Sequence, residues 1–530
     1  MSASKIISCL VLLVSFNTCL VSSAKILAVY PTPSISHHVV FRALTNELIR
    51  RGHEVTVITP NPEYPKGQAP SNLIEIDVHD LSYKMWSEVL LKGVTGSEND
   101  SVYSQATLIV RALSKIFEAQ IATKQVQDIF SKKQEHYDLL LLEACIKPVT
   151  ALTHIFKAPA IHVSSFGGLL YNYEVVGAPV HPLLYPSPLQ YRIYNLSTYE
   201  KLEQLYHRWR LESSFYEIEE EDNKRLQKIF GQDIPSIKEL SNNIDMLFLN
   251  IHPIWTANQP VPPNVVHIGG LQTHSPKELP KVSFVKSIKD LGLLLNSSRN
   301  GVIYFSLGTN VNTRILPQEK IQAMIKVFSQ LPYDVIWKCD QDSMPGKTEN
   351  VKLVKWVPQP DLLKHPKIKL FITQAGLQST DEAIDAGVPL IGIPMLGDQS
   401  FNTEKYRYFK IGIRLDLAEL TEELFKEAIE TVISDQSYRE NIIKLRTFMK
   451  DEPQTPLERA AWWIEYVLRH GGAKHLRAAG ANISWSQYLE LELVTYVFLV
   501  LFSAVLLVYC SLRYAISKYV GWPSVKIKES

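Results

Sequence analysis

Residues 371–399 read FITQAGLQSTDEAIDAGVPLIGIPMLGDQ, and this stretch indicates how the chain folds. Its first residues belong to an apolar, β-branched run over 368–373, which is typical of a parallel strand covered on both faces. A tight turn ends at Gly376, and the helix that follows ends at Gly387. A second apolar strand covers 390–393. A strand, a helix and a strand in succession predict an α/β fold with a parallel sheet.

The turn before this helix has the chemistry of a phosphate site. A helix N-terminus presents free backbone N–H groups and the positive end of the helix dipole to an anion. Glu382, Asp398 and Gln399 stand nearby in the sequence, and carboxylates accept hydrogen bonds from sugar hydroxyls. A phosphate site beside such acceptors predicts a nucleotide sugar as ligand. The alternative is an ordinary strand–helix–strand unit without a ligand.

The stretch resembles the donor-binding signature of the UDP-glycosyltransferase family, which includes UDP-glucuronosyl- and UDP-glucosyltransferases. The matching positions are Thr373, Gly376, Ser379, Glu382, Pro389, Pro394, Asp398 and Gln399, preceded by Trp356-Val357-Pro358-Gln359, which is similar to the family's Trp-x-Pro-Gln element. The likeness covers nearly the whole chain, is weakest between Lys66 and Lys133, and is close to the insect-type branch. It implies the GT-B fold, in which two Rossmann-like domains face each other across a cleft, here with one C-terminal transmembrane helix.

The bulk composition agrees with a folded protein of two domains. The chain has 530 residues, and its 55 basic and 54 acidic residues argue against nucleic acid as a partner. Cys9 and Cys19 lie in the N-terminal leader and Cys510 lies in an apolar tail. Cys145 and Cys339 remain in different predicted domains, so no disulfide framework is expected. We find no zinc-ligand spacing in the sequence.

Both ends of the chain carry membrane-targeting patterns. An apolar run followed by small residues over 1–24 predicts a cleaved signal peptide, with a retained anchor as the alternative. Residues 493–512 are apolar and uncharged, long enough for one transmembrane helix, and the basic residues that follow put the C-terminus in the cytosol. Lys526 and Lys528 resemble a dilysine retrieval signal. We therefore expect a single-pass type I protein of the endoplasmic reticulum membrane with luminal catalytic domains; a merely basic tail is the alternative.

The expected segments follow from these patterns and from the resemblance. They are a signal peptide over 1–24, an N-terminal acceptor-binding domain over 25–270, a linker over 271–300, a C-terminal UDP-sugar-binding domain over 301–455, helices returning to the first domain over 456–490, a transmembrane helix over 493–512 and a cytosolic basic tail over 513–530. Asn-x-Ser/Thr glycosylation motifs stand at Asn99, Asn195, Asn296 and Asn482.

Within these segments several local patterns predict elements. Residues 64–100 carry few signals, whereas 107–130 predict helical structure. Residues 199–230 predict a polar helix with a solvated face, and a partner-binding helix is the alternative. The Pro-, Tyr- and Gly-rich residues 166–194 predict loops around an acceptor pocket, and 351–357 predict a strand.

His37 stands where a ligand is expected. Residues 25–30 predict the first strand, a loop and an amphipathic helix follow, and His37 lies between them, at the carboxyl end of that strand. A neutral imidazole is a suitable base for a hydroxyl near pH 7. The resemblance implies this role, because the family has a Ser-His pair that Ser36-His37 matches. Two alternatives remain: His37 is only a helix-start residue, or His38 is the base.

Glu143 ends a second predicted buried strand, over 137–144. A carboxylate at that strand end would orient His37 and stabilise its positive form. The family usually has Asp here, so the side chain is longer by one methylene. The alternatives are that the orienting role lies elsewhere and that Glu143 faces solvent.

The resemblance also implies a donor site. Ser306 and Thr309 belong to a loop that meets the diphosphate, Trp356 stacks on uracil, and Gln359 reads the uracil edge. The full donor-binding set is Ser306, Thr309, Trp356, Gln359, Gln374, Gly376, Leu377, Gln378, Ser379, Glu382, Asp398 and Gln399. Gln374 stands where much of the family has His. In glucuronosyl relatives an Arg is expected at Leu249, and its absence favours UDP-glucose as donor.

The resemblance and these residues together predict an inverting UDP-glycosyltransferase that moves a hexose to a hydroxyl of a small lipophilic acceptor. The expected hexose is glucose, and the expected role is detoxification of xenobiotics or hormone-like molecules. UDP-sugar is a co-substrate, and no cofactor or metal is expected in the reaction. The expected partners are the UDP-sugar, the acceptor, the membrane and a second copy of the chain, without nucleic acid. Two alternatives stay open: a non-catalytic protein that binds UDP-sugar or lipophiles, and a glycosyltransferase acting on membrane lipids.

Overall fold

A computed structural model describes residues 23–95, 102–131, 136–273, 292–309, 316–519 and 521. The chain forms two compact units, residues 1–478 and 479–530. Nearly all of the predicted signal peptide, residues 274–291 of the predicted linker, the Asn99 motif and the two tail lysines lie outside the described residues.

The N-terminal half of the first unit is built on a seven-stranded parallel sheet in the order β3-β2-β1-β4-β5-β6-β7. Its strands are β1 (Lys25–Val29), β2 (Glu54–Thr59), β3 (Leu73–Asp77), β4 (Leu139–Glu143), β5 (Ala160–Ser164), β6 (Ile244–Leu249) and β7 (Val265–His267). Every residue of β4, β5 and β6 is buried. Such continuously apolar strands are stable because helices cover both faces of a parallel sheet.

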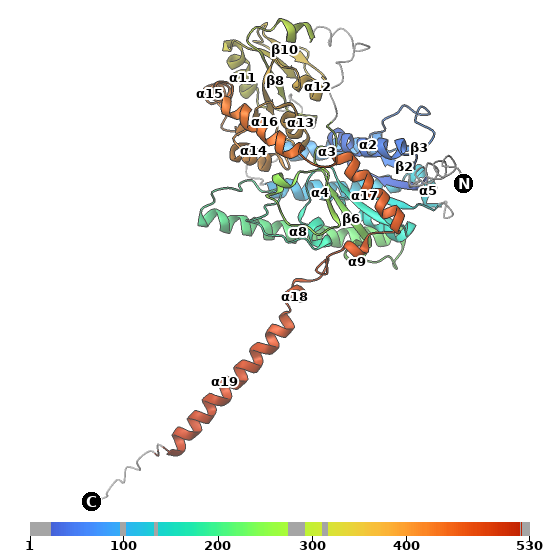
Figure 1. The fold of residues 1–530 in the computed structure, drawn as a ribbon, viewed down its shortest axis with the longest axis vertical. Coiled ribbons are helices and arrows are strands. Elements are labelled where there is room, and N and C mark those ends of the chain that lie inside the picture. The colour runs from blue at the N-terminus through green and yellow to red at the C-terminus, as the bar shows by residue number, and fades with distance from the viewer. Residues whose placement is uncertain are drawn as a thin grey trace, which may run out of the picture. The chain divides into compact units, whose positions relative to one another are not determined.

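The helices of this half are α2 (Ile35–Arg50), α3 (His79–Thr95), α4 (Val102–Ile121), α5 (Lys124–Ser131), α6 (Leu152–Phe156), α7 (Leu170–Val176), α8 (Thr198–Phe230) and α9 (Ile237–Leu240), with 3₁₀ turns η1 (Lys147–Ala151), η2 (Ser241–Asn243) and η3 (Pro253–Thr256). The first unit therefore has the alternating layers of an α/β protein (Figure 1).

The structure adds detail to several local predictions for this half. Residues 107–130 are helical as expected, in two helices, α4 and α5, because the backbone N–H and hydroxyl of Thr123 both donate to the Gln120 carbonyl and close the first helix. The weak-signal region 64–100 contains β3 and α3, and the expected loops over 166–194 include α7. The exposed face of α8 carries Tyr206 and Trp209 rather than polar groups alone.

The C-terminal half of the first unit is built on a six-stranded parallel sheet in the order β10-β9-β8-β11-β12-β13. Its strands are β8 (Val302–Ser306), β9 (Asp334–Lys338), β10 (Val351–Val354), β11 (Ile368–Thr373), β12 (Leu390–Gly392) and β13 (Gly412–Arg414). Its helices are α11 (Gln318–Gln330), α12 (Gln359–Leu363), α13 (Leu377–Ala386), α14 (Gln399–Tyr408), α15 (Glu422–Ser434) and α16 (Gln436–Lys450).

The stretch 371–399 folds as its pattern predicts, with β11, α13 and β12 in succession. The strand expected over 351–357 is shorter, because β10 ends at Val354. Pro358 has no N–H for a ladder hydrogen bond and restricts the residue before it. Trp356 consequently lies in a loop beyond the strand end.

Each sheet has one point at which the strand order reverses. In the first sheet β1 lies beside β4, and in the second β8 lies beside β11. Connections leaving such neighbouring strands diverge to opposite faces of the sheet and open a crevice at the carboxyl ends. His37 and Glu143 follow β1 and β4, whereas Ser306 and Gln374 follow β8 and β11. The topology therefore places all four near a crevice.

The helix α17 (Pro456–His470) returns from the second sheet to the first, as the sequence predicts. Ala460, Ile464 and Val467 of α17 are buried in one core with strands β1 and β2. Arg51, at the end of α2, donates from Nη1 to Glu465 Oε1 at 3.0 Å. Figure 1 shows α17 beside α2.

The second unit, residues 479–530, contains α18 (Trp485–Tyr488) and α19 (Leu491–Tyr519). The helix α19 has 29 residues and is long and apolar enough to cross a membrane. It includes the whole span predicted over 493–512.

Candidate active site

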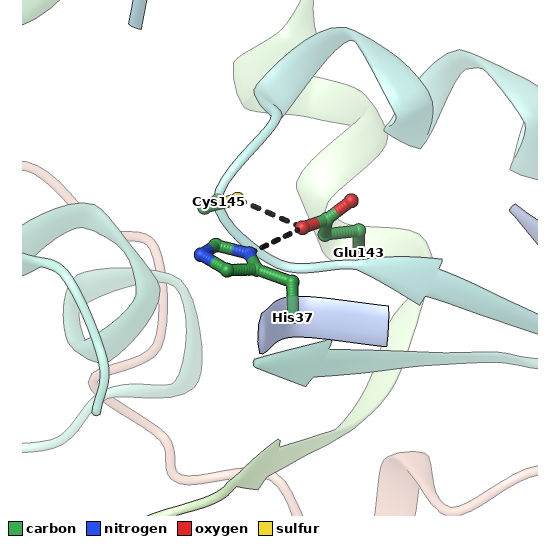
Figure 2. Close-up of side chains that lie close together, drawn as sticks. All are labelled: His37, Glu143 and Cys145. Atoms are coloured by element: carbon green, nitrogen blue, oxygen red, sulfur yellow. Dashed lines mark hydrogen bonds and ion pairs between the residues drawn. The ribbon is translucent and has the colours of Figure 1, made fainter. Parts of the chain in front are cut away.

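The His37 side chain lies in the first turn of α2 and lines a cavity between the two sheets. Its ring is 21% exposed. The Nδ1 atom lies 3.2 Å from Glu143 Oε1, and Figure 2 shows the other ring nitrogen pointing away from Glu143. With its Nδ1–H donated to the carboxylate, the neutral ring has its basic lone pair on Nε2.

Glu143 is the last residue of β4 and is fully buried, so it does not face solvent. Its Oε2 accepts the Thr32 backbone N–H at 3.0 Å, and its Oε1 accepts the Cys145 thiol at 3.4 Å. Burial alone raises the pKa of this carboxyl, but the hydrogen bond from His37, the attraction of the His37 and His38 rings when they are protonated, and the Thr32 N–H together outweigh burial and hold the pKa below its usual value. The carboxyl is therefore ionised and reaches His37 despite the extra methylene.

His38 points the opposite way from its neighbour. Its ring is buried, with Nε2 2.8 Å from the Thr32 carbonyl and Nδ1 3.1 Å from the Thr59 hydroxyl. Burial lowers the pKa of His38 to about 4. With both nitrogens bonded inside the protein, this ring does not line the cavity.

The opposite wall begins at the N-terminus of α13. Gly376 is the N-cap with extended backbone (φ −62°, ψ 147°), and no side chain caps the first turn. Gly376, Gln378 and Ser379 line the cavity, whereas the Leu377 side chain is buried beneath them. The first N–H groups of α13 have no partner within the helix, which is the condition for anion binding.

The loop after β8 continues this wall with Ser306, Gly308 and Thr309. Gly308 has φ +77°, and a Cβ there would lie 2.1 Å from Gln374 Nε2, so a larger residue would have to displace the Gln374 side chain. The Gln374 Oε1 atom is buried and has no hydrogen-bond partner among the residues that the structure describes. An unpaired buried acceptor beside a glycine cradle is typical of a site that binds a polar ligand.

Trp356 and Gln359 line the part of the cavity that follows strand β10. Trp356 is 60% exposed, so much of its ring is accessible to a flat ligand. Gln359 is held in place by Tyr304, whose hydroxyl donates to Gln359 Oε1 at 3.1 Å. Gln359 Nε2 in turn lies 3.0 Å from Ser379 Oγ and 2.7 Å from Glu382 Oε2.

Two acidic residues of the predicted set line the cavity with raised pKa values. Burial raises the pKa of Glu382 to about 7, against the opposing hydrogen bond from Gln359. Burial also raises the pKa of Asp398, while Asn402 Nδ2 donates to Asp398 Oδ2 at 3.0 Å. Gln399 Oε1 accepts the backbone N–H groups of Met395 and Leu396 at 2.7 and 2.8 Å. Its amide NH₂ group is thereby oriented away from that loop.

The cavity has a volume of about 400 Å³ and brings together most of the predicted residues. Those that line it are His37, Ser306, Thr309, Trp356, Gln359, Gln374, Gly376, Gln378, Ser379, Glu382, Asp398 and Gln399. Leu377 and Glu143 lie directly behind the lining.

Apolar side chains line the end of the cavity near His37. Phe166, Leu169 and Leu189 come from the segment expected to contact the acceptor. Trp86 of α3 and Leu113 of α4 complete this wall and were missed, because residues 64–100 gave few signals. The apolar stripe of α4 was a usable signal for Leu113.

Sequence reasoning also missed two polar residues of the site. Lys338, at the end of β9, lines the cavity and donates to the Gly308 carbonyl at 2.7 Å, with Nζ 5.1 Å from the Trp356 ring centroid. Asn402 accepts from Trp255 Nε1 at 2.8 Å and donates to the Ala375 carbonyl at 2.9 Å. It thus ties the turn before α13 to a buried Trp of the first half. Neither residue belongs to the motifs recognised in the sequence.

Comparison with known proteins agrees with this architecture. The family model described as UDP-glucoronosyl and UDP-glucosyl transferase matches residues 24–525. An ecdysteroid UDP-glucosyltransferase of Spodoptera littoralis nuclear polyhedrosis virus is 33% identical over 516 residues, which cover 94% of this chain and 98% of the relative. The UDP-glycosyltransferase UGT5 of Dactylopius coccus is 31% identical over 529 residues, which cover 96% of this chain and 97% of the relative.

A solved structure supports the fold. The crystal structure of Arabidopsis thaliana UGT89C1 complexed with UDP-L-rhamnose superposes with a TM-score of 0.55 at 14% identity, covering 84% of this chain and 100% of that chain. The expected GT-B arrangement of two Rossmann-like domains is confirmed. With a family model that spans almost the whole chain and relatives matched over nearly their full length, the chain belongs to the UDP-glycosyltransferase family, on the insect-type branch, and is a glycosyltransferase that uses a UDP-sugar as co-substrate.

Proposed function

We propose that the chain is an inverting glucosyltransferase that moves glucose from UDP-glucose to a hydroxyl of a small lipophilic acceptor. The observation that carries this proposal is the shared cavity. His37, backed by Glu143, lines the same cavity as the donor-signature residues and an apolar wall. A base, a donor site and a lipophilic site in one cavity are what a transfer to an acceptor hydroxyl requires.

In the proposed reaction His37 Nε2 removes the proton of the acceptor hydroxyl as its oxygen attacks the sugar C1. Glu143 holds the ring through Nδ1–H and stabilises the imidazolium that forms. The oxygen approaches from the face opposite UDP, so the C1–O bond to UDP breaks and the configuration inverts. The apolar residues around His37 exclude water and disfavour hydrolysis of the donor.

The donor set divides into three roles in this proposal. Ser306, Thr309, Gln374 and the N–H groups at the start of α13, over 376–379, bind the diphosphate and stabilise the charge of the departing UDP. Trp356 stacks on uracil while Gln359 reads its edge. Glu382, Asp398 and Gln399 bind sugar hydroxyls. No step in this scheme requires a metal.

We choose glucose over glucuronate because the site suits a sugar without a charged group. Leu249 is a fully buried apolar residue where glucuronosyl relatives are expected to have Arg. The carboxylate of Asp398 and the amide of Gln399 suit neutral hydroxyls, and the Asp398 carboxylate would repel a uronate. The name of the viral relative supports the same donor and points to ecdysteroids, which are polyhydroxylated steroids, as acceptors.

We also infer the cellular arrangement from the sequence. A cleaved signal peptide over 1–24 would direct the rest of the chain to the endoplasmic reticulum. The acceptor domain over 25–270, the linker over 271–300 and the donor domain over 301–455 would then lie in the lumen. The apolar helix α19 supports a membrane anchor, and the basic residues after it favour a type I orientation. Glycosylation of the Asn-x-Ser/Thr motifs would follow from that location.

The proposal is tested with membranes containing the full chain, incubated with UDP-glucose or UDP-glucuronate and a panel of phenols, sterols and ecdysteroids. Mass spectrometry identifies the product, and NMR identifies its anomeric configuration. We expect a β-glucoside from UDP-glucose. A glucuronide would contradict the donor assignment, and an α-glucoside would contradict inversion. Binding of UDP-glucose without transfer to any acceptor would favour a non-catalytic binding protein.

A further inference from the structure

Cys145 stands at the candidate base and has no role in the proposed reaction. It follows β4 by two residues, its thiol donates to Glu143 Oε1 at 3.4 Å, and it lines the cavity beside His37. Figure 2 shows its sulfur and the His37 ring on the same side of the Glu143 carboxylate. Imidazole, carboxylate and thiolate are all zinc ligands.

Two of the three distances between the ligand atoms are close to those of a tetrahedral zinc site. His37 Nδ1, Glu143 Oε1 and Cys145 Sγ all lie within 4.8 Å of one another. The Nδ1 to Oε1 distance is 3.2 Å and the Sγ to Oε1 distance is 3.4 Å. In a tetrahedral zinc site with ordinary bond lengths, the ligand nitrogen and oxygen lie about 3.4 Å apart, and the ligand sulfur and oxygen lie about 3.6 Å apart. These two distances therefore need to change by only a few tenths of an ångström when zinc binds.

We propose that these three residues form an inhibitory site for Zn²⁺. The inference rests on the proposed role of His37 as the base. Binding would release the thiol proton to solvent, so that one thiolate and one carboxylate neutralise the doubly charged ion in a buried place. The fourth tetrahedral position faces the cavity, where a water molecule completes the coordination.

A zinc ion at this position blocks the base without entering the donor site. Coordination through Nδ1 leaves the only ring proton on Nε2, so the imidazole has no lone pair for the acceptor hydroxyl. Glu143 is bound to the metal and no longer orients the ring. UDP-glucose contacts residues of the opposite wall, so its binding is retained.

The ligand set also predicts which ions act. A thiolate with an imidazole favours Zn²⁺ and Co²⁺ and disfavours Mg²⁺ and Ca²⁺, which prefer oxygen ligands. The sequence shows no spaced zinc motif, because the three residues come from α2 and the end of β4 and meet only in the fold.

The site is tested first by binding, on purified full-length protein in detergent. Added Co²⁺ should give the thiolate-to-cobalt charge-transfer absorption and the intense visible bands of tetrahedral Co²⁺, both removed by Zn²⁺. Cys145→Ala and Cys145→Ser should both lose the charge-transfer band. The matched control is Cys339→Ala, at the other buried cysteine of the described chain, and this variant should keep the band. This readout does not depend on turnover, so it separates failure of the zinc site from failure of the proposed reaction.

The second test is inhibition of glucosyl transfer, with each protein compared to its own uninhibited rate. Zn²⁺ should inhibit the wild type without raising KM for UDP-glucose, EDTA should reverse the inhibition, and Mg²⁺ should have no effect. Cys145→Ser should raise the half-inhibiting Zn²⁺ concentration by at least about tenfold. Absence of the cobalt–thiolate band in the wild type, or equal Zn²⁺ sensitivity of wild type and both Cys145 variants, would overturn the proposal.

Discussion

At the scale of single residues, two adjacent histidines have opposite environments because they lie in a helix. Successive residues of an α-helix are rotated by about 100°, so when His37 faces the cavity His38 faces the core. His38 is then held by Thr32 and Thr59, while His37 keeps one nitrogen for a ligand. The assignment of His37 as the base is therefore a matter of orientation, which the Ser-His pattern alone leaves open.

Replacing Glu143 by Gln tests the orienting carboxylate. Gln keeps the size of the side chain but removes the charge that stabilises imidazolium. We expect kcat to fall by about 10²- to 10⁴-fold with KM for UDP-glucose unchanged. Steady-state kinetics on membranes measure both. Glu143→Asp restores the usual family residue and should retain more activity than Gln; equal losses in the two variants would argue against a role for the charge.

The raised pKa of Glu382 predicts how donor binding depends on pH. Burial raises this pKa to about 7, and sugar hydroxyls donate to the ionised form. A ligand that favours the carboxylate binds more tightly as pH rises through that pKa, so the Kd for UDP-glucose should fall between about pH 6 and pH 8 and then level off. Calorimetry checks this, and UDP-glucose is suitable because its diphosphate diester does not titrate in this range.

The matched variant for the pH experiment is Glu382→Gln. It keeps a hydrogen-bond acceptor for hydroxyls and removes the titration, so its Kd should be flat over the same range. A pH dependence that persists in Glu382→Gln would assign the titration to another group of the cavity.

At the scale of single elements, the site is built from the turns that follow four strands. The turn after β8 needs Gly308, which combines φ +77° with close contact to Gln374. Gly67 has a similar backbone, φ +80°, with open space around it. Substitution of either glycine carries the cost of a left-handed backbone, but only substitution of Gly308 also crowds the site. Comparing the two therefore separates these effects.

We expect both Gly308→Ala and Gly67→Ala to lower the free energy of unfolding by about 1–2 kcal/mol, the cost of a left-handed Ala. Only Gly308→Ala should also displace Gln374 and raise KM for UDP-glucose by at least about tenfold. Thermal unfolding and steady-state kinetics measure the two effects. A donor KM that is unchanged in Gly308→Ala would show that this turn does not contact the UDP-sugar.

The sequence predicted the elements with clear periodicity and missed those defined by their surroundings. β11, α13 and β12 carry strong local signals, and their place in the sheet follows from them. The break after Ile121 depends on a Thr123 hydrogen bond, and β3 is an edge strand with only one fully buried residue, so neither has a strong pattern. Lys338 and Asn402 reach the site through tertiary contacts, which no local motif encodes.

At the scale of the whole molecule, the cavity is formed by two sheets that the sequence keeps far apart. Residues near position 37 and residues near position 398 line it together because both sheets direct their strand ends toward it. Trp255 and Asn402 join the halves at the base of the donor site. The resemblance to a known family predicted that the two halves face each other across one site. The periodicity of the sequence alone predicted only the strands and helices within each half.

The second unit, residues 479–530, is expected to anchor the protein without contributing to the site. Among the described residues, those that line the cavity all precede position 479. Truncation after Ala478 should release the protein from membranes under alkaline carbonate extraction while preserving UDP-glucose binding. Immunoblotting of pellet and supernatant measures the partition. A truncated protein that stays in the membrane pellet would show that the first unit has a membrane attachment of its own.

The most direct test of the account compares the wild type with His37→Ala for turnover and for donor binding. Membranes are supplied with UDP-glucose and an acceptor that the wild type glucosylates. UDP release gives kcat, and calorimetry on the purified proteins gives the Kd for UDP-glucose. We predict that kcat falls by at least about 10³-fold in His37→Ala while the Kd stays within twofold of the wild type. Turnover that survives in His37→Ala would contradict the central claim that this residue is the base.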